Sequence, residues 1–251
     1  TSMETSIKEN SGNPLLDYFV GNSGRSIHKW VHYFDIYHRH FQKFRGLPVT
    51  VLEIGIQNGG SAHMWKNYFG PESRIVGVDV DPSCRSLEDD GFDVWIGDQS
   101  DPNLLNVLVQ SYPAIDIIID DGSHMVDHQN ASFSALFPHL NDGGVYICED
   151  THSSYFPAHG GGLHKKNTFI EVSKNLIDEM HAWYHAPLRD ISSAYMAQYL
   201  NAICYYDSMV VLEKKRKNPP LILARGFDGH LQNPPAMTHI EMRRFFGVSD
   251  Q

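Results

Sequence analysis

Five short apolar runs recur along the first 150 residues, and each one passes into polar or glycine residues. Stretches such as 101–112 and 128–140, which have the spacing of helices, separate several of these runs. Strands that alternate with helices predict an α/β fold, in which a parallel sheet is covered by helices on both faces. The five runs are residues 49–55, 74–80, 92–98, 114–121 and 143–150.

Two further β-rich runs follow within residues 201–217 and meet at Asp207 and Ser208. They predict an antiparallel hairpin at the edge of the sheet. The glycine-rich stretch 151–168 before them is typical of a lid or binding loop, and the proline-rich stretch after them has no clear period. We therefore predict an N-terminal helical extension (1–46), a ligand-binding α/β domain with a lid loop (47–217, lid 151–168) and a C-terminal tail (218–251).

A helix is predicted ahead of the first strand, between Ile27 and Phe44. Apolar residues recur there at intervals of three and four, as one face of a helix requires. Gly46 and Pro48 then end the pattern. This helix is expected to cover other apolar residues. Its predicted face consists of Ile27, Trp30, Val31, Phe34, Tyr37, His38, Phe41 and Phe44.

The composition narrows the classes of partner. The formal net charge of −10 argues against a general affinity for nucleic acid or for anionic membranes, which need a basic surface. The three cysteines lack the spacing of a zinc or redox site, and no apolar stretch reaches the length of a membrane span. The polar start also lacks the apolar region of a signal peptide. We therefore expect a cytoplasmic protein with small-molecule or protein partners.

The first candidate site is the stretch "LEIGIQNGGS", residues 52–61. A strand that ends in an acid and then in glycines, just before a helix, makes a tight turn that a ligand can approach closely. Gln57 stands where the dinucleotide fingerprint has its middle glycine, so this is not that fingerprint. An acid before the turn suits an ammonium group, although small residues needed only for packing would also explain the glycines. The candidate ligand-binding residues are Glu53, Gly55, Gly59 and Ser61.

Two more candidates follow the next two strands. Asp79 ends the second strand, about twenty residues beyond the glycines, where an acid commonly accepts hydrogen bonds from both ribose hydroxyls. Asp98 and Gln99 follow the third strand and offer an acceptor and an amide that suit an adenine edge. A turn or helix-cap role is the alternative for each, and Asp81 is the better candidate for a cap.

Two pairs of acids end the fourth and fifth strands. Asp120 and Asp121 begin "DDGSH", and Glu149 and Asp150 end "VYICED". The carboxyl ends of neighbouring parallel strands meet at the mouth of the ligand crevice, so we expect the four acids to converge. Four carboxylates cannot all stay ionised without a cation, and oxygen ligands suit magnesium. Each acid alone could instead cap a helix.

Histidines are frequent, and most are expected to be surface or packing residues. His124 is the exception, because it lies one short turn beyond Asp121. His128 is expected on a helix surface. His152, His159 and His164 could be taken for a zinc site, but their irregular spacing argues against it.

These motifs together resemble the class I S-adenosylmethionine-dependent methyltransferases, whose seven-stranded sheet ends in such a hairpin. More narrowly, "VLEIGIQNGGSAHMWKNYF", "GDQSD", "IIIDDGSH", "LFPHLNDGGVYICEDTHSSYFP" and "YYDSMVVLEK" are similar to the metal-dependent sugar O-methyltransferases of macrolide biosynthesis, of the mycinamicin type. The similarity covers about Ser26 to Lys214. The resemblance implies S-adenosylmethionine and Mg²⁺ as cofactors and a Rossmann-like methyltransferase sheet.

The resemblance also implies residue roles. Asp121, Glu149 and Asp150 would hold the magnesium ion, Asp121 also acting in catalysis, and His124 would be the general base. Here the first acid of the fifth-strand pair is a glutamate, which departs from the family pattern. The predicted reaction is transfer of a methyl group from the sulfonium to a hydroxyl on the sugar of a natural-product glycoside. Vicinal hydroxyls could both reach the metal, and the lid would exclude water, with Tyr155 and Phe156 as stacking surfaces.

Several alternatives remain at this point. The acceptor could be a catechol or another phenol, which also binds magnesium. A nicotinamide-dependent oxidoreductase and a binding subunit without activity are the other two hypotheses, and Gln57 and the acidic crevice count against the oxidoreductase. A homo-oligomer, dimer or tetramer, is expected from the same resemblance.

Overall fold

The computed structural model describes residues 11–191, 193–223 and 237–249 of the chain. The polar start at 1–10 and two parts of the predicted tail, 224–236 and 250–251, lie outside the described residues. Within the described ranges, no helix is both long and apolar enough to cross a lipid bilayer.

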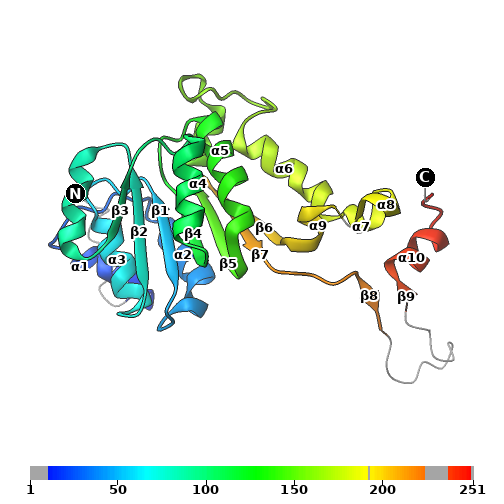
Figure 1. Cartoon of the computed structure of the whole chain (residues 1–251), viewed down its shortest axis with the longest axis horizontal. Helices are drawn as coiled ribbons and strands as arrows, with labels where there is room; N and C mark the ends of the chain where they lie inside the picture. The colour runs from blue at the N-terminus through cyan, green and yellow to red at the C-terminus, as the bar shows by residue number, and fades with distance from the viewer. Residues whose placement is uncertain (1–10, 192, 224–236, 250–251) are drawn as a thin grey trace.

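Seven strands form one sheet in the order β3-β2-β1-β4-β5-β7-β6 (Figure 1). The first five strands run parallel, whereas β7 pairs antiparallel with both β5 and β6. The predicted fold, with an edge hairpin turning at Asp207 and Ser208, is confirmed. The strands are β1 (Thr50–Ile54), β2 (Arg74–Asp79), β3 (Asp93–Ile96), β4 (Ile115–Asp120), β5 (Leu140–Glu149), β6 (Leu200–Tyr206) and β7 (Met209–Lys214).

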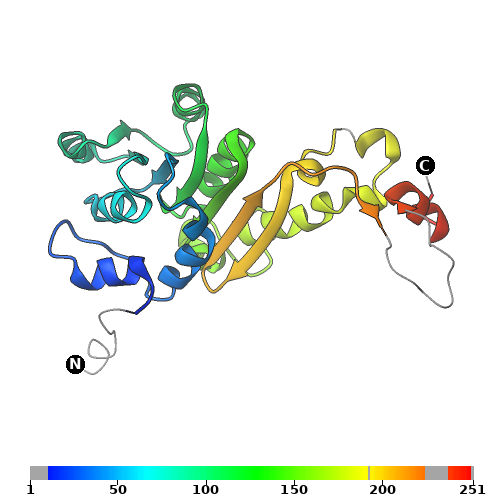
Figure 2. The ribbon, with the colours of Figure 1, turned by 90° about the horizontal axis from the view of Figure 1, so that it is seen from below.

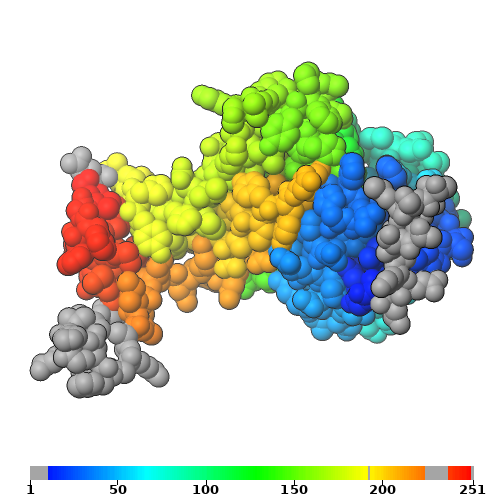
Figure 3. All heavy atoms as spheres, turned by 180° about the vertical axis from the view of Figure 1, so that it is seen from behind, coloured from blue at the N-terminus to red at the C-terminus, as the bar shows by residue number. Residues whose placement is uncertain are grey.

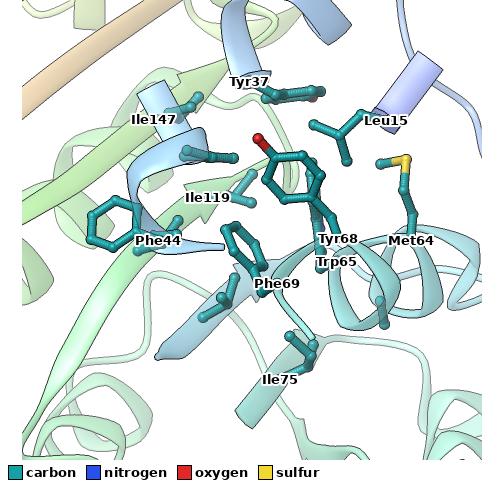
Figure 4. Packing of buried hydrophobic residues seen from close by; sticks show 14 of the residues in the cluster. Leu15, Tyr37, Phe44, Met64, Trp65, Tyr68, Phe69, Ile75, Ile119 and Ile147 are labelled. Atoms are coloured by element: carbon teal, nitrogen blue, oxygen red, sulfur yellow. The ribbon is translucent and has the colours of Figure 1, made fainter. Parts of the chain in front are cut away.

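One face of the sheet packs against an aromatic-rich layer of helices. Trp65 and Phe69 of α3 are fully buried and belong to the same apolar cluster as Ile119 and Ile147 of the central strands (Figure 4). Burying one large apolar side chain contributes about 1.5–3 kcal/mol, so this layer holds the N-terminal helices firmly on the sheet. The elements of this layer are α1 (Pro14–Gly21), α2 (Tyr33–Phe41), the 3₁₀ turn η2 (Gln42–Phe44) and α3 (Gly60–Phe69).

The other face is covered by α4 and α5, which Figure 2 shows on the opposite side of the sheet from α1. α4 begins as its sequence predicts: Asp101 accepts a hydrogen bond from the Asn103 N–H, and Pro102 occupies the first turn. The elements here are α4 (Pro102–Ser111), α5 (Val126–Leu136), η4 (Phe137–His139) and α6 (Phe169–Met180), while η3 (Pro82–Asp90) links β2 to β3.

The predicted helix between Ile27 and Phe44 is wrong over its first part. The α-helix begins only at Tyr33, and Trp30 and Val31 are 54% and 53% exposed rather than part of a buried face. The residues before Tyr33 instead cross the carboxyl edge of the sheet. From there the side chains of Lys29 and Trp30 contact acids at the ends of β4 and β5.

An arm projects from the sheet beyond α6 (Figures 1 and 3). The described part of the tail folds onto α7, because the buried Arg243 donates to the Ala186 carbonyl at 2.6 Å. The sequence showed no period here, since α10 spans only seven residues. The arm consists of α7 (Ala182–His185), α8 (Leu188–Ile191), α9 (Tyr195–Tyr199), β8 (Leu221–Ile222), β9 (Met237–Thr238) and α10 (His239–Phe245).

The strand register places the ends of the parallel strands at one edge. Ile54 is level with both Val78 and Asp120, and Asp120 is level with Cys148. The loops that follow β1, β2, β4 and β5 therefore start side by side. The 3₁₀ turns η5 (Thr151–Tyr155) and η6 (Pro157–His159) follow β5 at this edge.

Candidate active site

The turn after β1 brings three strands into close contact. Gly55 has a φ of +87° and donates its N–H to the Val78 carbonyl at 2.7 Å. A Cβ atom at Gly55 would lie 2.0 Å from the carbonyl oxygen of Asp121. Gly59 is also left-handed, with a φ of +81°, and precedes α3. Only glycine fits the close approach at Gly55, so the packing of this turn on the loop after β4 is itself a reason for the glycine.

Glu53 lies next to this turn and is fully buried. Its Oε2 atom accepts a hydrogen bond from the Ser61 hydroxyl at 2.7 Å, and its Oε1 atom is 3.6 Å from Nζ of Lys29. Burial raises the pKa of Glu53, while Lys29 and Ser61 act in the opposite direction. The sequence suggested that Glu53 suits an ammonium group, and in the structure the ammonium of Lys29 lies beside it.

A cavity opens at the tips of β1 to β4. Asp79 accepts hydrogen bonds from the N–H groups of Gln57 at 2.9 Å and Asp81 at 3.0 Å. The Asp98 carboxylate accepts hydrogen bonds from the N–H and the hydroxyl of Ser100, two residues further along the same loop. The structure therefore brings several predicted ligand-binding residues to one cavity. Its wall includes Gly55, Gln57, Asp79, Asp98, Gln99, Asp121 and also His128, which was expected on a plain helix surface.

Gln99 and Asp120 pair with each other beneath this cavity. The Gln99 amide donates to Asp120 Oδ1 at 3.0 Å and to the Ser132 hydroxyl at 2.9 Å, and its oxygen accepts from the Ser123 N–H. Asp120 is only 1% exposed, and this burial raises its pKa to about 6. Gln99 thus has protein partners on both ends of its amide. Asp120 lies with Gln99 and Tyr146, away from the other three acids.

Asp120 is expected to make the protein less stable as pH rises. Its pKa in the folded protein lies above the ordinary value of 3.8, so the folded protein binds this proton more tightly than the unfolded chain does. The free energy of unfolding should fall between about pH 4 and pH 7 on this account and stay level above that range. Asp120→Asn keeps an acceptor for Gln99 and removes the buried charge.

At pH 8 we expect Asp120→Asn to raise the free energy of unfolding by roughly 2–3 kcal/mol, at about 1.4 kcal/mol per pKa unit. At pH 4.5 the variant and the wild type should differ little. Urea unfolding at the two pH values measures both differences. A variant that is no more stable than the wild type at pH 8 would show that the ionised carboxylate is well accommodated.

Asp121 and Asp150 meet a histidine at the ends of β4 and β5. The Nε2 atom of His124 lies 3.3 Å from Oδ2 of Asp150 and 3.9 Å from Oδ1 of Asp121. Among the described residues, this is the only group of three acid, histidine or cysteine side chains whose ligand atoms lie within 4.8 Å of one another. His124 and Asp150 both have left-handed backbones, with φ of 59° and 52°. Such strained non-glycine residues tend to cluster at functional sites.

A lysine that the sequence did not single out completes this crevice. Lys29 Nζ lies 2.6 Å from Oδ2 of Asp121 and 2.9 Å and 3.1 Å from the two oxygens of Glu149. Burial alone would lower the pKa of Lys29, but the charges of Asp121, Glu149 and Glu53 together raise it well above its ordinary value. Glu149 also accepts a hydrogen bond from the Tyr37 hydroxyl. The chain itself, through Lys29, therefore supplies part of the positive charge that these acids require.

A second cavity lies on the β5 side of Asp121. Trp30 Nε1 and the Tyr33 hydroxyl both donate to Oδ1 of Asp150, at 3.1 Å and 2.7 Å, which leaves Oδ2 facing His124. The rings of Trp30 and His152 are 6.1 Å apart, edge to face. The cavity thus joins aromatic walls to an acidic floor. It is lined by His28, Lys29, Trp30, Val31, Tyr33, Asp121, Glu149, Asp150 and His152.

The three histidines considered as a zinc site do not come together as a metal-binding group in the described part of the chain. The His152 ring pairs with the Ser208 hydroxyl, and the exposed side chain of His164 lies 3.6 Å from Glu171. The irregular spacing of these histidines had argued against a zinc site.

No protein-family model matches the chain. An 8-demethyl-8-(2-methoxy-alpha-L-rhamnosyl)-tetracenomycin-C 3'-O-methyltransferase of Streptomyces olivaceus is 35% identical over 199 residues, 75% of this chain and 50% of the relative. A demethylmacrocin O-methyltransferase of Streptomyces fradiae is 35% identical over 215 residues, 80% of this chain and 52% of the relative. The chain thus spans about half the length of these curated relatives.

A solved structure gives the same result for the fold. The MycE methyltransferase from the mycinamycin biosynthetic pathway, in complex with Mg and SAH, superposes with a TM-score of 0.71 at 29% identity. The alignment covers 88% of this chain and 58% of that protein. The chain therefore has the class I methyltransferase fold and is a homologue of the tetracenomycin- and macrolide-type sugar O-methyltransferases.

Proposed function

We propose that the chain is an S-adenosylmethionine- and magnesium-dependent O-methyltransferase that acts on a sugar hydroxyl of a natural-product glycoside. The observation that carries this proposal is the position of Asp121, which lines the cavity at β1 to β4, the second cavity and the small cavity between them. A donor in the first cavity and an acceptor in the second would meet at this residue. The relatives named above are methyltransferases, which favours this hypothesis over a nicotinamide-dependent oxidoreductase.

The donor would occupy the first cavity. Asp79 lies at the tip of β2, where it suits the ribose hydroxyls, and Asp98 lies on the adenine side of the same cavity. Gly55 lines this cavity and would face the methionine part, while the hydrogen-bonded pair of Glu53 and Ser61 is buried next to the same turn. Gln99 and Asp120 act from beneath, because their hydrogen bonds hold the loop that carries Gly122 and Ser123.

The residues at the second cavity fit a magnesium ion. Asp121 and Asp150 each present one oxygen toward His124, and magnesium commonly takes one or two protein carboxylates together with waters. When bound, the ion would lower the pKa of an acceptor hydroxyl in contact with it. Glu149, predicted as a third ligand, makes its contacts with Lys29 and Tyr37.

His124 has the position of a proton acceptor for the reaction. It would take the hydroxyl proton as the acceptor oxygen attacks the methyl carbon; the carbon–oxygen bond forms, the carbon–sulfur bond breaks, and S-adenosylhomocysteine leaves. The sulfonium is already a reactive electrophile, so the protein mainly positions the two reactants and removes one proton. Trp30 and His152 form an aromatic wall for a sugar ring, and the half-exposed Phe156 extends it.

Methyl transfer tests the proposal directly. The protein is incubated with methyl-labelled S-adenosylmethionine and a panel of rhamnosides, macrolide glycosides and catechols, with Mg²⁺ or with excess chelator. We expect label on a glycoside and a loss of about 100-fold or more in chelator. Transfer to catechols alone would change the acceptor class, full activity in chelator would remove the metal, and donor binding without any transfer would favour a binding subunit.

We further propose that the protein works in the cytoplasm as a homo-oligomer, a dimer or a tetramer. Cys84, Cys148 and Cys204 are all free thiols, as a reducing compartment would keep them. Phe245 and Phe246 on the projecting arm are 75% and 72% exposed, which is costly unless another surface covers them. Sedimentation equilibrium tests the assembly, and a monomer at all concentrations would rule it out.

A further inference from the structure

Lys29 divides the acidic crevice into two sides. Its ammonium contacts Oδ2 of Asp121 and both oxygens of Glu149, and its side chain is only 2% exposed. The other side is formed by Oδ1 of Asp121, Oδ2 of Asp150 and Nε2 of His124. Asp121 is the one acid that belongs to both sides.

The backbone around Lys29 is held at both ends. Before it, the Ser26 hydroxyl accepts a hydrogen bond from the Asn58 side chain, and the Ser26 carbonyl packs so closely on Gly60 that a Cβ atom there would lie 2.1 Å away. After it, Trp30 donates to Asp150. Lys29 is therefore placed by its segment and does not reach the crevice as a loose surface side chain.

The charges require such an arrangement. Buried carboxylates are costly without a positive partner, and a dication that contacts Asp121 and Asp150 from the His124 side leaves Glu149 and Glu53 to be compensated. Lys29 lies within 3.6 Å of both of these glutamates. It therefore supplies the positive charge on the side where a single ion at the His124 group would not reach.

We propose that Lys29 is a positioning residue: its fixed positive charge occupies Glu149 and Oδ2 of Asp121, and so confines the dication to Oδ1 of Asp121 and Asp150, next to His124. This inference rests on the metal dependence proposed above. It implies that Glu149 is a partner of Lys29 and does not ligate the ion.

The test is direct binding of Mn²⁺, followed by electron paramagnetic resonance, with neither donor nor acceptor present. Lys29→Met removes a positive charge beside the ion and frees Glu149, so we expect it to bind Mn²⁺ about tenfold more tightly than the wild type. Lys29→Arg keeps the charge and should stay within about threefold of the wild type. Glu149→Gln should also stay within about threefold, since the residue is no ligand.

A second comparison is needed in case the Lys29→Met variant does not fold. Lys29→Met combined with Glu149→Gln leaves one buried acid fewer, and it should bind Mn²⁺ about threefold or more tightly than Glu149→Gln alone. A merely structural lysine would weaken binding when removed, which is the opposite direction. Equal or weaker binding without Lys29, or a loss of more than about tenfold in Glu149→Gln, would overturn the inference. Failure of the wild type to bind Mn²⁺ would instead overturn the proposed metal dependence.

Discussion

Replacement of His124 is expected to lower turnover by about 10²- to 10⁴-fold, the usual contribution of a general base. The imidazole is the one side chain of the acidic group that is not a carboxylate, and its Nε2 atom faces both Asp121 and Asp150. Those acids are committed to a cation, so the histidine is the residue that can accept the acceptor's proton. Turnover of a glycoside with saturating donor and Mg²⁺ measures the loss.

The choice of variant matters because His124 has a left-handed backbone, with a φ of 59°. Asparagine tolerates this conformation better than alanine does, so His124→Asn removes the base with less backbone strain, and His124→Ala shows what strain adds. Both variants should keep donor binding by calorimetry. His139→Ala, an exposed histidine outside the cavities at the strand tips, serves as the control. Turnover above about a tenth of the wild-type rate in His124→Asn would exclude the role of base.

The same histidine experiment separates two chemical roles. If Nε2 were a metal ligand, His124→Asn would lower the affinity for Mn²⁺ together with turnover. If His124 acts as base, turnover falls while the affinity for Mn²⁺ changes little. The three-residue group contains the histidine in either case, so only this pair of measurements assigns its role.

Much of the fold could be predicted because its signals are local. Each parallel strand is an apolar run, and a run of this kind must be buried on both faces of the sheet. The convergence of Asp121 and Asp150 follows from topology alone, since neighbouring parallel strands end at the same edge. The prediction that all four acids converge was wrong for Asp120. Side chains alternate along a strand, so Asp120 shares a face with Ile118, next to the buried Tyr146, and points away from Asp121.

The missing part of the site has no such local signal. Lys29 pairs with Asp121 and Glu149, which lie 92 and 120 residues away in the chain. Its neighbours fit a helical period, and the exposed Trp30 and Val31 were therefore assigned to a buried face. Only the charge requirement of the acids pointed to a cation, and it could not distinguish a bound ion from a side chain. The path of the segment before α2 shows that a side chain, Lys29, supplies part of this positive charge.

Gly55→Ala is expected to abolish donor binding and to destabilise the protein strongly. The new Cβ atom would lie 2.0 Å from the Asp121 carbonyl oxygen, and its φ of +87° is itself unfavourable for alanine. Backbone atoms cannot move aside as a flexible side chain can, so β1 and the loop after β4 must separate. We expect a loss of about 4 kcal/mol or more in the free energy of unfolding. Affinity for S-adenosylhomocysteine should fall beyond detection by calorimetry.

Gly91→Ala is the matched control for this prediction. Gly91 has nearly the same φ, +86°, but nothing lies within 4 Å of its added Cβ. Gly91→Ala should therefore lower the free energy of unfolding only by the conformational cost, about 1–2 kcal/mol, and donor binding should be unchanged. The difference between the two variants in urea unfolding measures the close approach of the β1 turn to Asp121. An equal decrease in the free energy of unfolding of both variants would mean that the chain relaxes around the new methyl group. The contact between the β1 turn and Asp121, the residue shared by both cavities, would then not hold the site together.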